Sequence, residues 1–266
     1  MPTPTIESVE VLGGRLEMQV AVMGEGEPLV YLHSAGGLKW DSFMESLAER
    51  YKVYAPYYPG THVSDPHAIE HVESLWDAVL AYDDLLDQLG LESCRLVGWS
   101  FGGMLACELA AQRREKISKL VAISPVGLWR DDAPYSCATF TAIPAEDLPG
   151  ILFHRLDAPE VKRYLAVPDD PIAEAEANLA LVWALACTCK VIWPIPDKGL
   201  DRRIHRVTAP SLVVWGEHDR LVSSVYAKEF GNALPNSEVF ILSDTGHGPL
   251  QEDPDKGIPK VQSFLA

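Results

Sequence analysis

Basic side chains are scarce in this sequence, and their scarcity excludes several kinds of partner. Lysine and arginine together number 22 against 38 aspartates and glutamates, so the formal net charge is −16. Nucleic acids and anionic membrane surfaces attract dense basic patches, whereas this chain offers only a short cluster of Arg202, Arg203 and Arg206. We therefore expect no nucleic acid and no membrane surface as a partner.

Long hydrophobic runs and cysteines are also few. A transmembrane helix needs about 18 or more consecutive apolar residues, and the best stretch, Leu179 to Cys187, is shorter. The segment MPTPTIESVE lacks the basic and apolar regions of a signal peptide. The cysteines are odd in number and show no metal-site spacing, which suits reduced thiols in a cytoplasmic protein without a metal site. They are Cys94, Cys107, Cys137, Cys187 and Cys189.

The composition is that of a soluble globular protein. Of the 266 residues, 47% are hydrophobic and 23% are charged. This length corresponds to one large domain or a modest pair, and it leaves the oligomeric state open.

Short apolar runs alternate with longer segments of helical period, a pattern that predicts an α/β fold with a mostly parallel sheet. The predicted strands are Leu16–Val22, Leu29–His33, Lys52–Ala55, Arg95–Gly98, Leu120–Ser124, Leu212–Gly216 and Val239–Leu242. The predicted helices between them are Trp40–Arg50, Ile69–Leu89, Phe101–Arg114, Val222–Leu234 and Pro254–Leu265. The first two strands have no helix between them, so we expect them to form an antiparallel pair.

The alternation breaks over residues 125–210, which hold ten of the 20 prolines. Because proline ends helices and removes ladder donors, we predict short helices here that lie outside the sheet. The best helix is Pro171–Cys187, with an expected apolar face of Ile172, Leu179, Val182, Trp183 and Ala186. The predicted organisation is a core of residues 1–124 and 211–266 with a helical cap of residues 125–210.

The strongest chemical signal is a G-x-S-x-G motif between a predicted strand and a predicted helix. It reads Gly98-Trp99-Ser100-Phe101-Gly102-Gly103. A tight turn at this place exposes a serine hydroxyl at the carboxyl edge of the sheet, and the flanking glycines leave room for it. Ser100 is therefore the candidate nucleophile.

A serine nucleophile needs a base, and the base needs an orienting carboxylate. His247 stands between two glycines after the last predicted strand, and Asp219 follows the strand Leu212–Gly216. We predict His247 as the base and Asp219 as its acid, with Glu217 and Asp244 as alternatives. An oxyanion also needs two backbone donors, which we assign to Phe101 and to Ala35 in the loop after Leu29–His33. We expect His33 to brace that loop.

Together these residues resemble the α/β-hydrolase fold family. The resemblance rests on the loop His33-Ser34-Ala35-Gly36-Gly37, the serine motif, the turn from Gly216 to Asp219 and the Gly246-His247 turn. It implies helices on both faces of the central sheet, a cap inserted after the sixth strand, and no cofactor. Ser34 departs from the family pattern, which usually has glycine there. The serine nucleophile argues against the epoxide hydrolase and haloalkane dehalogenase branches, which use aspartate.

The resulting prediction is a serine hydrolase, specifically a carboxylesterase that cleaves small neutral esters through an acyl-enzyme on Ser100. Trp99, Trp183 and Trp193 are expected to line the substrate pocket. One alternative is a carbon–carbon bond hydrolase of β-diketone-like ring-fission products, which would need Arg155 or an arginine of the 202–206 cluster near Ser100. The other is a receptor-like binding protein with slow or vestigial activity.

Overall fold

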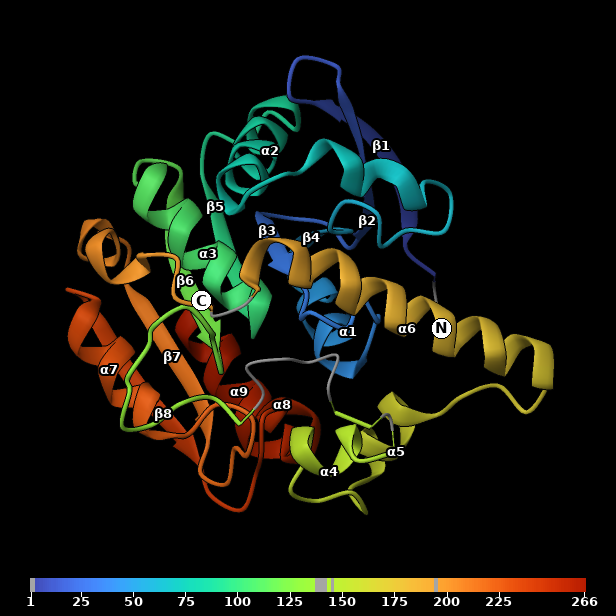
Figure 1. Ribbon diagram of the computed structural model, residues 1–266. Helices are drawn as coiled ribbons and strands as arrows, with labels where there is room; N and C mark the ends of the chain where they lie inside the picture. The colour runs from blue at the N-terminus through green and yellow to red at the C-terminus, as the bar shows by residue number, and fades with distance from the viewer. Residues whose placement is uncertain (1–2, 137–142, 145, 194–195) are drawn as a thin grey trace.

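The computed structural model describes residues 3–136, 143–144, 146–193 and 196–266, and its centre is an eight-stranded sheet (Figure 1). The strand order is β1-β2-β4-β3-β5-β6-β7-β8. The strands are β1 Thr5–Val11, β2 Leu16–Met23, β3 Pro28–Leu32, β4 Lys52–Pro56, β5 Cys94–Trp99, β6 Ile117–Ile123, β7 Ser211–Gly216 and β8 Ser237–Leu242. The sheet is parallel from β4 to β8, and β1 and β2 add an antiparallel edge.

The expected antiparallel pairing of β2 with β3 is wrong. Strand β4 lies between them, antiparallel to β2 and parallel to β3. The antiparallel partner of β2 on its other side is β1, which the sequence analysis missed. Most residues of β1 are exposed, so this edge strand carries little of the hydrophobic signal on which strand prediction depends.

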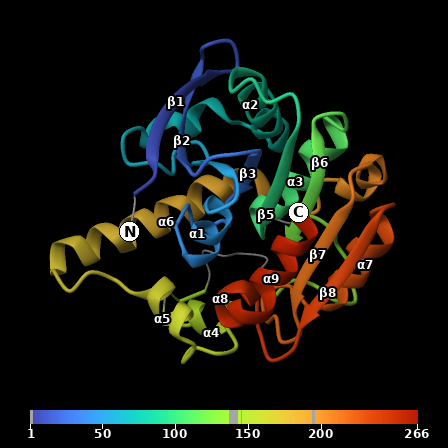
Figure 2. The same cartoon turned by 180° about the vertical axis from the view of Figure 1, so that it is seen from behind.

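Helices cover both faces of the sheet, which confirms the predicted fold class (Figures 1 and 2). On one face pack α2 (Leu75–Gln88), α3 (Phe101–Gln112) and α7 (Val225–Ala233). On the other pack α1 (Ser42–Ala48), α8 (Pro249–Glu252) and α9 (Pro254–Leu265). Successive residues of β5 point to opposite faces of the sheet. Leu96 belongs to the apolar cluster on the face of α2, α3 and α7, and Val97 to the cluster on the face of α1, α8 and α9. The central strand is therefore buried from both sides.

The interval between β6 and β7 contains helices and no strand among its described residues. These are α4 (Leu148–Leu152), α5 (Pro159–Leu165), α6 (Pro171–Ile192) and the 3₁₀ turns η3 (Leu200–Arg202) and η4 (Ile204–Arg206). A further 3₁₀ turn, η1 (Pro66–His71), precedes α2. Cys137 lies outside the described residues. The division into core and cap at residues 125 and 210 stays a prediction.

Helix α6 divides into two halves with different surroundings. Its C-terminal half is buried through Ala184, Cys187 and Val191, and it lies against the loop that contains Gly36. Its N-terminal half extends away from the rest of the molecule (Figures 1 and 2). The expected apolar face of α6 is therefore not buried, because Ile172 and Leu179 are 71% and 68% exposed.

Among the described helices, α6 is the one that by length and composition alone could cross a membrane. No such segment was expected, because the longest run of consecutive apolar residues, Leu179 to Cys187, is too short to cross a membrane. In the structure this helix packs against the rest of the protein through Cys187, Thr188 and Val191, which are buried. Insertion of α6 into a bilayer would break these contacts.

Candidate active site

Ser100 occupies the tight turn between the end of β5 and the start of α3. Its backbone has φ 56° and ψ −113°, a region that residues with a side chain rarely adopt. The turn closes because Gly98 and Gly102 lack side chains: a Cβ on Gly102 would lie 2.1 Å from the carbonyl oxygen of Leu32. This close packing holds the strained serine at the carboxyl edge of the sheet.

The structure brings Ser100, His247 and Asp219 together in one hydrogen-bonded chain. His247 Nε2 lies 2.9 Å from Ser100 Oγ, and His247 Nδ1 lies 2.7 Å from Asp219 Oδ2. A carboxylate can only accept, so Nδ1 carries the proton and Nε2 is left to accept the serine proton. The other oxygen of Asp219 accepts from the backbone N–H groups of Leu221 and Val222, both at 2.9 Å. All three side chains are buried.

The two alternative acids lie elsewhere. Glu217 is about half exposed and lies 3.9 Å from His218. Asp244 is 66% exposed and contacts His154 at 3.1 Å. Of the three acids considered, Asp219 is the one that the structure pairs with His247.

His33 braces the loop after β3, as expected. Its Nε2 accepts from the backbone N–H of Tyr58 at 2.9 Å, so its Nδ1 carries the proton and donates to the carbonyl of Ser34 at 2.7 Å. Burial lowers the pKa of His33 to about 4, so the ring is neutral at pH 7. With both nitrogens engaged, His33 is unsuited to act as the base. Ser34 is not among the described residues with positive φ, so its side chain fits the loop without backbone strain.

The two predicted oxyanion donors lie on the segments expected for them. Phe101 is the first residue of α3, where a backbone N–H has no partner within the helix. Ala35 is buried, and its carbonyl accepts from Thr188 Oγ1 on α6 at 3.3 Å. The roles of both N–H groups stay predictions.

The three candidate pocket tryptophans separate in the structure. Trp99 is buried next to Ser100 in the chain, and its indole N–H donates to the carbonyl of His247 at 2.8 Å. Trp183 donates to the carbonyl of Gly60 at 2.9 Å. Trp193 is 48% exposed and lines a cavity of about 440 Å³ with Trp76 and two lysines, and neither Ser100 nor His247 lines that cavity. Of the three, Trp99 is the one with a described contact to His247.

Glu252, a buried acid in α8, was not predicted as a site residue. Its carboxylate accepts from the backbone N–H groups of Gly246 (2.6 Å), His154 (2.9 Å) and Arg155 (2.7 Å). Burial raises the pKa of Glu252, and these three donors oppose that rise. Glu252 thus ties the turn before His247 to the segment after α4. In the sequence, Glu252 appears only as an acid five positions after His247 and next to Asp253. Two neighbouring acids are typical of an exposed surface, so the pattern gave no reason to expect a buried side chain.

Fold and site together define a hydrolase of the α/β class. The chain belongs to the alpha/beta hydrolase family, whose profile matches residues 29–258. It is 27% identical to the pimeloyl-(acyl-carrier protein) methyl ester esterase of Vibrio atlanticus (strain LGP32), over 91% of this chain and 96% of that protein.

Two solved structures illustrate the shared fold. A meta-cleavage product hydrolase from Pseudomonas fluorescens IP01 has a TM-score of 0.76 at 19% identity, over 97% of both chains. A carboxylesterase from Bacillus subtilis has a TM-score of 0.73 at 18% identity, over 100% of this chain and 92% of that one.

Proposed function

We propose that this protein is a serine carboxylesterase that hydrolyses small neutral esters through an acyl-enzyme on Ser100. The observation that carries the proposal is the buried hydrogen-bonded chain from Ser100 through His247 to Asp219, at 2.9 and 2.7 Å. An imidazole held in this tautomer accepts the serine proton at the moment of attack. The relative in Vibrio atlanticus, which is named as a methyl ester esterase, supports the same class of reaction.

In the proposed mechanism, Ser100 Oγ attacks the ester carbonyl carbon while His247 Nε2 takes its proton. Asp219 stabilises the imidazolium, and the N–H groups of Phe101 and Ala35 stabilise the oxyanion. His247 then gives the proton to the departing alcohol, which leaves the acyl group on Ser100. A water molecule, deprotonated by His247, attacks this acyl-enzyme and releases the acid and the free serine.

The arginines support an ester over a ring-fission product with a carboxylate. Arg203 makes two hydrogen bonds to the buried carboxylate of Glu108, at 2.6 and 2.7 Å. Arg206 donates to the carbonyl of Ala111 at 3.1 Å, and Arg155 lies 3.9 Å from Asp244. Among the described residues, these three guanidinium groups contact Glu108, Ala111 and Asp244, and none contacts Ser100 or His247. This favours the ester over the carbon–carbon hydrolase alternative, whose substrate would need an arginine at Ser100.

The decisive experiment is the Ser100→Ala variant assayed with p-nitrophenyl acetate. We expect the loss of a nucleophile of this type to lower kcat by more than about a thousandfold, with an unchanged circular dichroism spectrum. Ser8→Ala, the same change on the exposed strand β1, should keep full activity. A Ser100→Ala protein that retains a tenth of the activity would contradict the proposal.

Covalent labelling separates the esterase from the receptor-like alternative. A fluorophosphonate probe reacts only with an activated serine, so we expect labelling of the native chain and none of Ser100→Ala. Failure of the native chain to label, together with tight binding of an unreacted ligand, would favour the receptor.

The acyl group is expected to be short to medium in length. Ser100 is 3% exposed and His247 1%, and the bulky side chains of Trp99 and Phe101 flank the nucleophile. A series of p-nitrophenyl esters from C2 to C12 should show kcat/KM declining toward the long end, and an optimum at C12 would refute this preference.

A further inference from the structure

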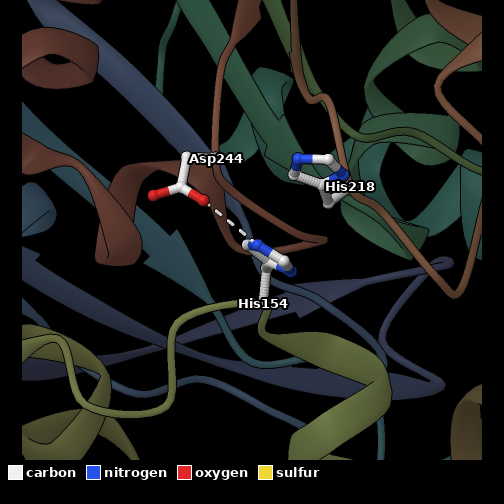
Figure 3. A group of neighbouring side chains, drawn as sticks. All are labelled: His154, His218 and Asp244. Atoms are coloured by element: carbon white, nitrogen blue, oxygen red, sulfur yellow. Dashed lines mark hydrogen bonds and ion pairs between the residues drawn. The ribbon is translucent and has the colours of Figure 1, made fainter.

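Three further side chains form a cluster at the surface, close in sequence to Asp219 and His247 or to the segment that contacts them. His154 follows α4, His218 precedes Asp219 in the loop after β7, and Asp244 lies in the loop between β8 and His247. Figure 3 shows the three facing one another, and one potential metal-ligand atom from each lies within 4.8 Å of the other two. We propose that His154, His218 and Asp244 form a binding site for a divalent transition metal ion such as Zn²⁺.

The donor set is the first argument. Two imidazoles and one carboxylate are the ligands that Zn²⁺ prefers, whereas Mg²⁺ prefers oxygen alone. Two ligands bound at about 2.0–2.2 Å in tetrahedral geometry lie roughly 3.3 Å apart, and His154 Nε2 already lies 3.1 Å from Asp244 Oδ1. The His154 and His218 rings stack at a centroid distance of 4.3 Å with a 30° tilt, and a nitrogen of His218 lies within 4.8 Å of the other two ligand atoms. Binding therefore requires the His218 ring to turn so that this nitrogen points at the ion.

One ligand of the site is held in place by the protein, and the other two are accessible to solvent. The backbone N–H of His154 is held by Glu252, which fixes this ligand in place, while His218 and Asp244 are 48% and 66% exposed. Exposure lets an ion enter and lets water complete its coordination. The Nδ1 atom of His154 is buried with no hydrogen-bond partner in the described part of the chain. Nε2, on the other side of the ring, is the atom that faces Asp244 and is the ligand atom of the proposed site.

The charged neighbours of Asp244 leave one of its two carboxylate oxygens free to bind an ion. Arg155 approaches Asp244 Oδ2 at 3.9 Å, while Oδ1 faces His154. His218 Nε2 also lies 3.9 Å from Glu217, an acid whose charge favours a bound cation.

The position of the site gives binding a structural consequence. Its ligands come from the segment after α4 and from the two loops that carry Asp219 and His247. A bound ion would therefore join three segments that are distant in sequence, and binding to the folded state alone raises its stability.

The test is calorimetric titration of the metal-free full-length chain with ZnCl₂. We expect one high-affinity ion per chain, a loss of affinity of at least about tenfold in His154→Ala and His218→Ala, and no binding of Mg²⁺. Asp244→Asn should also weaken binding, and asparagine tolerates the positive φ of 59° at this position. The matched control is His67→Ala, which breaks an exposed histidine–acid pair with Glu70 at 3.0 Å and should leave binding unchanged.

Thermal unfolding supplies a second measurement that does not depend on esterase activity. At a hundredfold excess of Zn²⁺ over its dissociation constant, Tm of the native chain should rise by about 5 °C or more, and Tm of His218→Ala should not move. Absence of Zn²⁺ binding, or binding that survives both histidine substitutions, would overturn the proposal. Neither result bears on the role of Ser100.

Discussion

His33 and His247 illustrate how neighbours decide what a histidine can do. Both are buried, but the partners of His33 are a backbone N–H and a backbone carbonyl, whereas those of His247 are a hydroxyl and a carboxylate. Backbone partners fix a neutral ring in place, while a carboxylate stabilises the imidazolium that forms during proton transfer. Both residues lie in loops after strands, β3 and β8, and the difference lies in what each ring contacts.

The low pKa of His33 predicts a pH dependence of stability. The unfolded chain takes up a proton near pH 6.5, but the native ring resists protonation down to about pH 4, so this contribution is full above pH 6.5 and is lost as the pH falls toward 4. Between pH 7 and pH 5 the loss is about 2 kcal/mol. Urea unfolding at both pH values should show this fall in the native chain and a smaller one in His33→Gln.

The control for this prediction is His67→Ala, whose side chain is 79% exposed in the native structure and whose removal should leave the pH dependence unchanged. Identical falls in the native chain and in His33→Gln would contradict the assignment to His33.

At the scale of elements, the junction between β5 and α3 depends on close backbone approach. A Cβ on Gly98 would lie 2.3 Å from the carbonyl oxygen of Gly102, and a Cβ on Gly102 would lie 2.1 Å from that of Leu32. Both contacts are with backbone atoms, which cannot move aside as a flexible side chain can. The start of α3 is thus locked against β3 and β5, and this fixes where Ser100 stands.

Gly102→Ala should therefore push α3 away from β3. We expect it to lower the free energy of unfolding by about 3 kcal/mol or more and to lower kcat, because Ser100 and the N–H of Phe101 move with the helix. Gly150→Ala in α4 is the matched control, since a Cβ there meets nothing within 4 Å. Equal stability of the two variants in chemical denaturation would show that the junction is more yielding than its geometry indicates.

The helices and strands differ in how well their positions could be predicted from the sequence. Helix α9 and the strands β5 to β8 carry strong periodicity, and they occur where the pattern indicated, with shifts at their ends. Strand β1 and the course of α6 did not follow from the pattern. The exposed residues of β1 carry little apolar signal, and the apolar residues of α6 do not determine whether another element covers them.

For the molecule as a whole, the charge of −16 sets the conditions under which a substrate approaches. A field of one sign slows the encounter with anions of the same sign and leaves neutral molecules unaffected. Salt shortens the range of this field from about 30 Å at 0.01 M to about 8 Å at 0.15 M.

We therefore expect kcat/KM for an anionic ester, such as p-nitrophenyl hemisuccinate, to rise about twofold to fivefold between 10 and 300 mM NaCl. The value for the neutral p-nitrophenyl acetate should stay constant over the same range. Steady-state kinetics with both esters checks this, and a parallel rise for both would point to an effect of salt on the protein itself.

The sequence by itself determined the features that arise from local chemistry. Strand and helix periodicity indicated the parallel core, and the glycines around Ser100 and His247 indicated tight turns that carry reactive side chains. Only the tertiary structure decided which strand lies beside which, with β4 between β2 and β3, and which acid lies within hydrogen-bond distance of His247. It also brought Glu252 under the histidine turn and His154 beside His218 and Asp244. These contacts join residues far apart in the chain, and their hydrogen bonds and close packing depend on how the whole chain folds rather than on any local pattern.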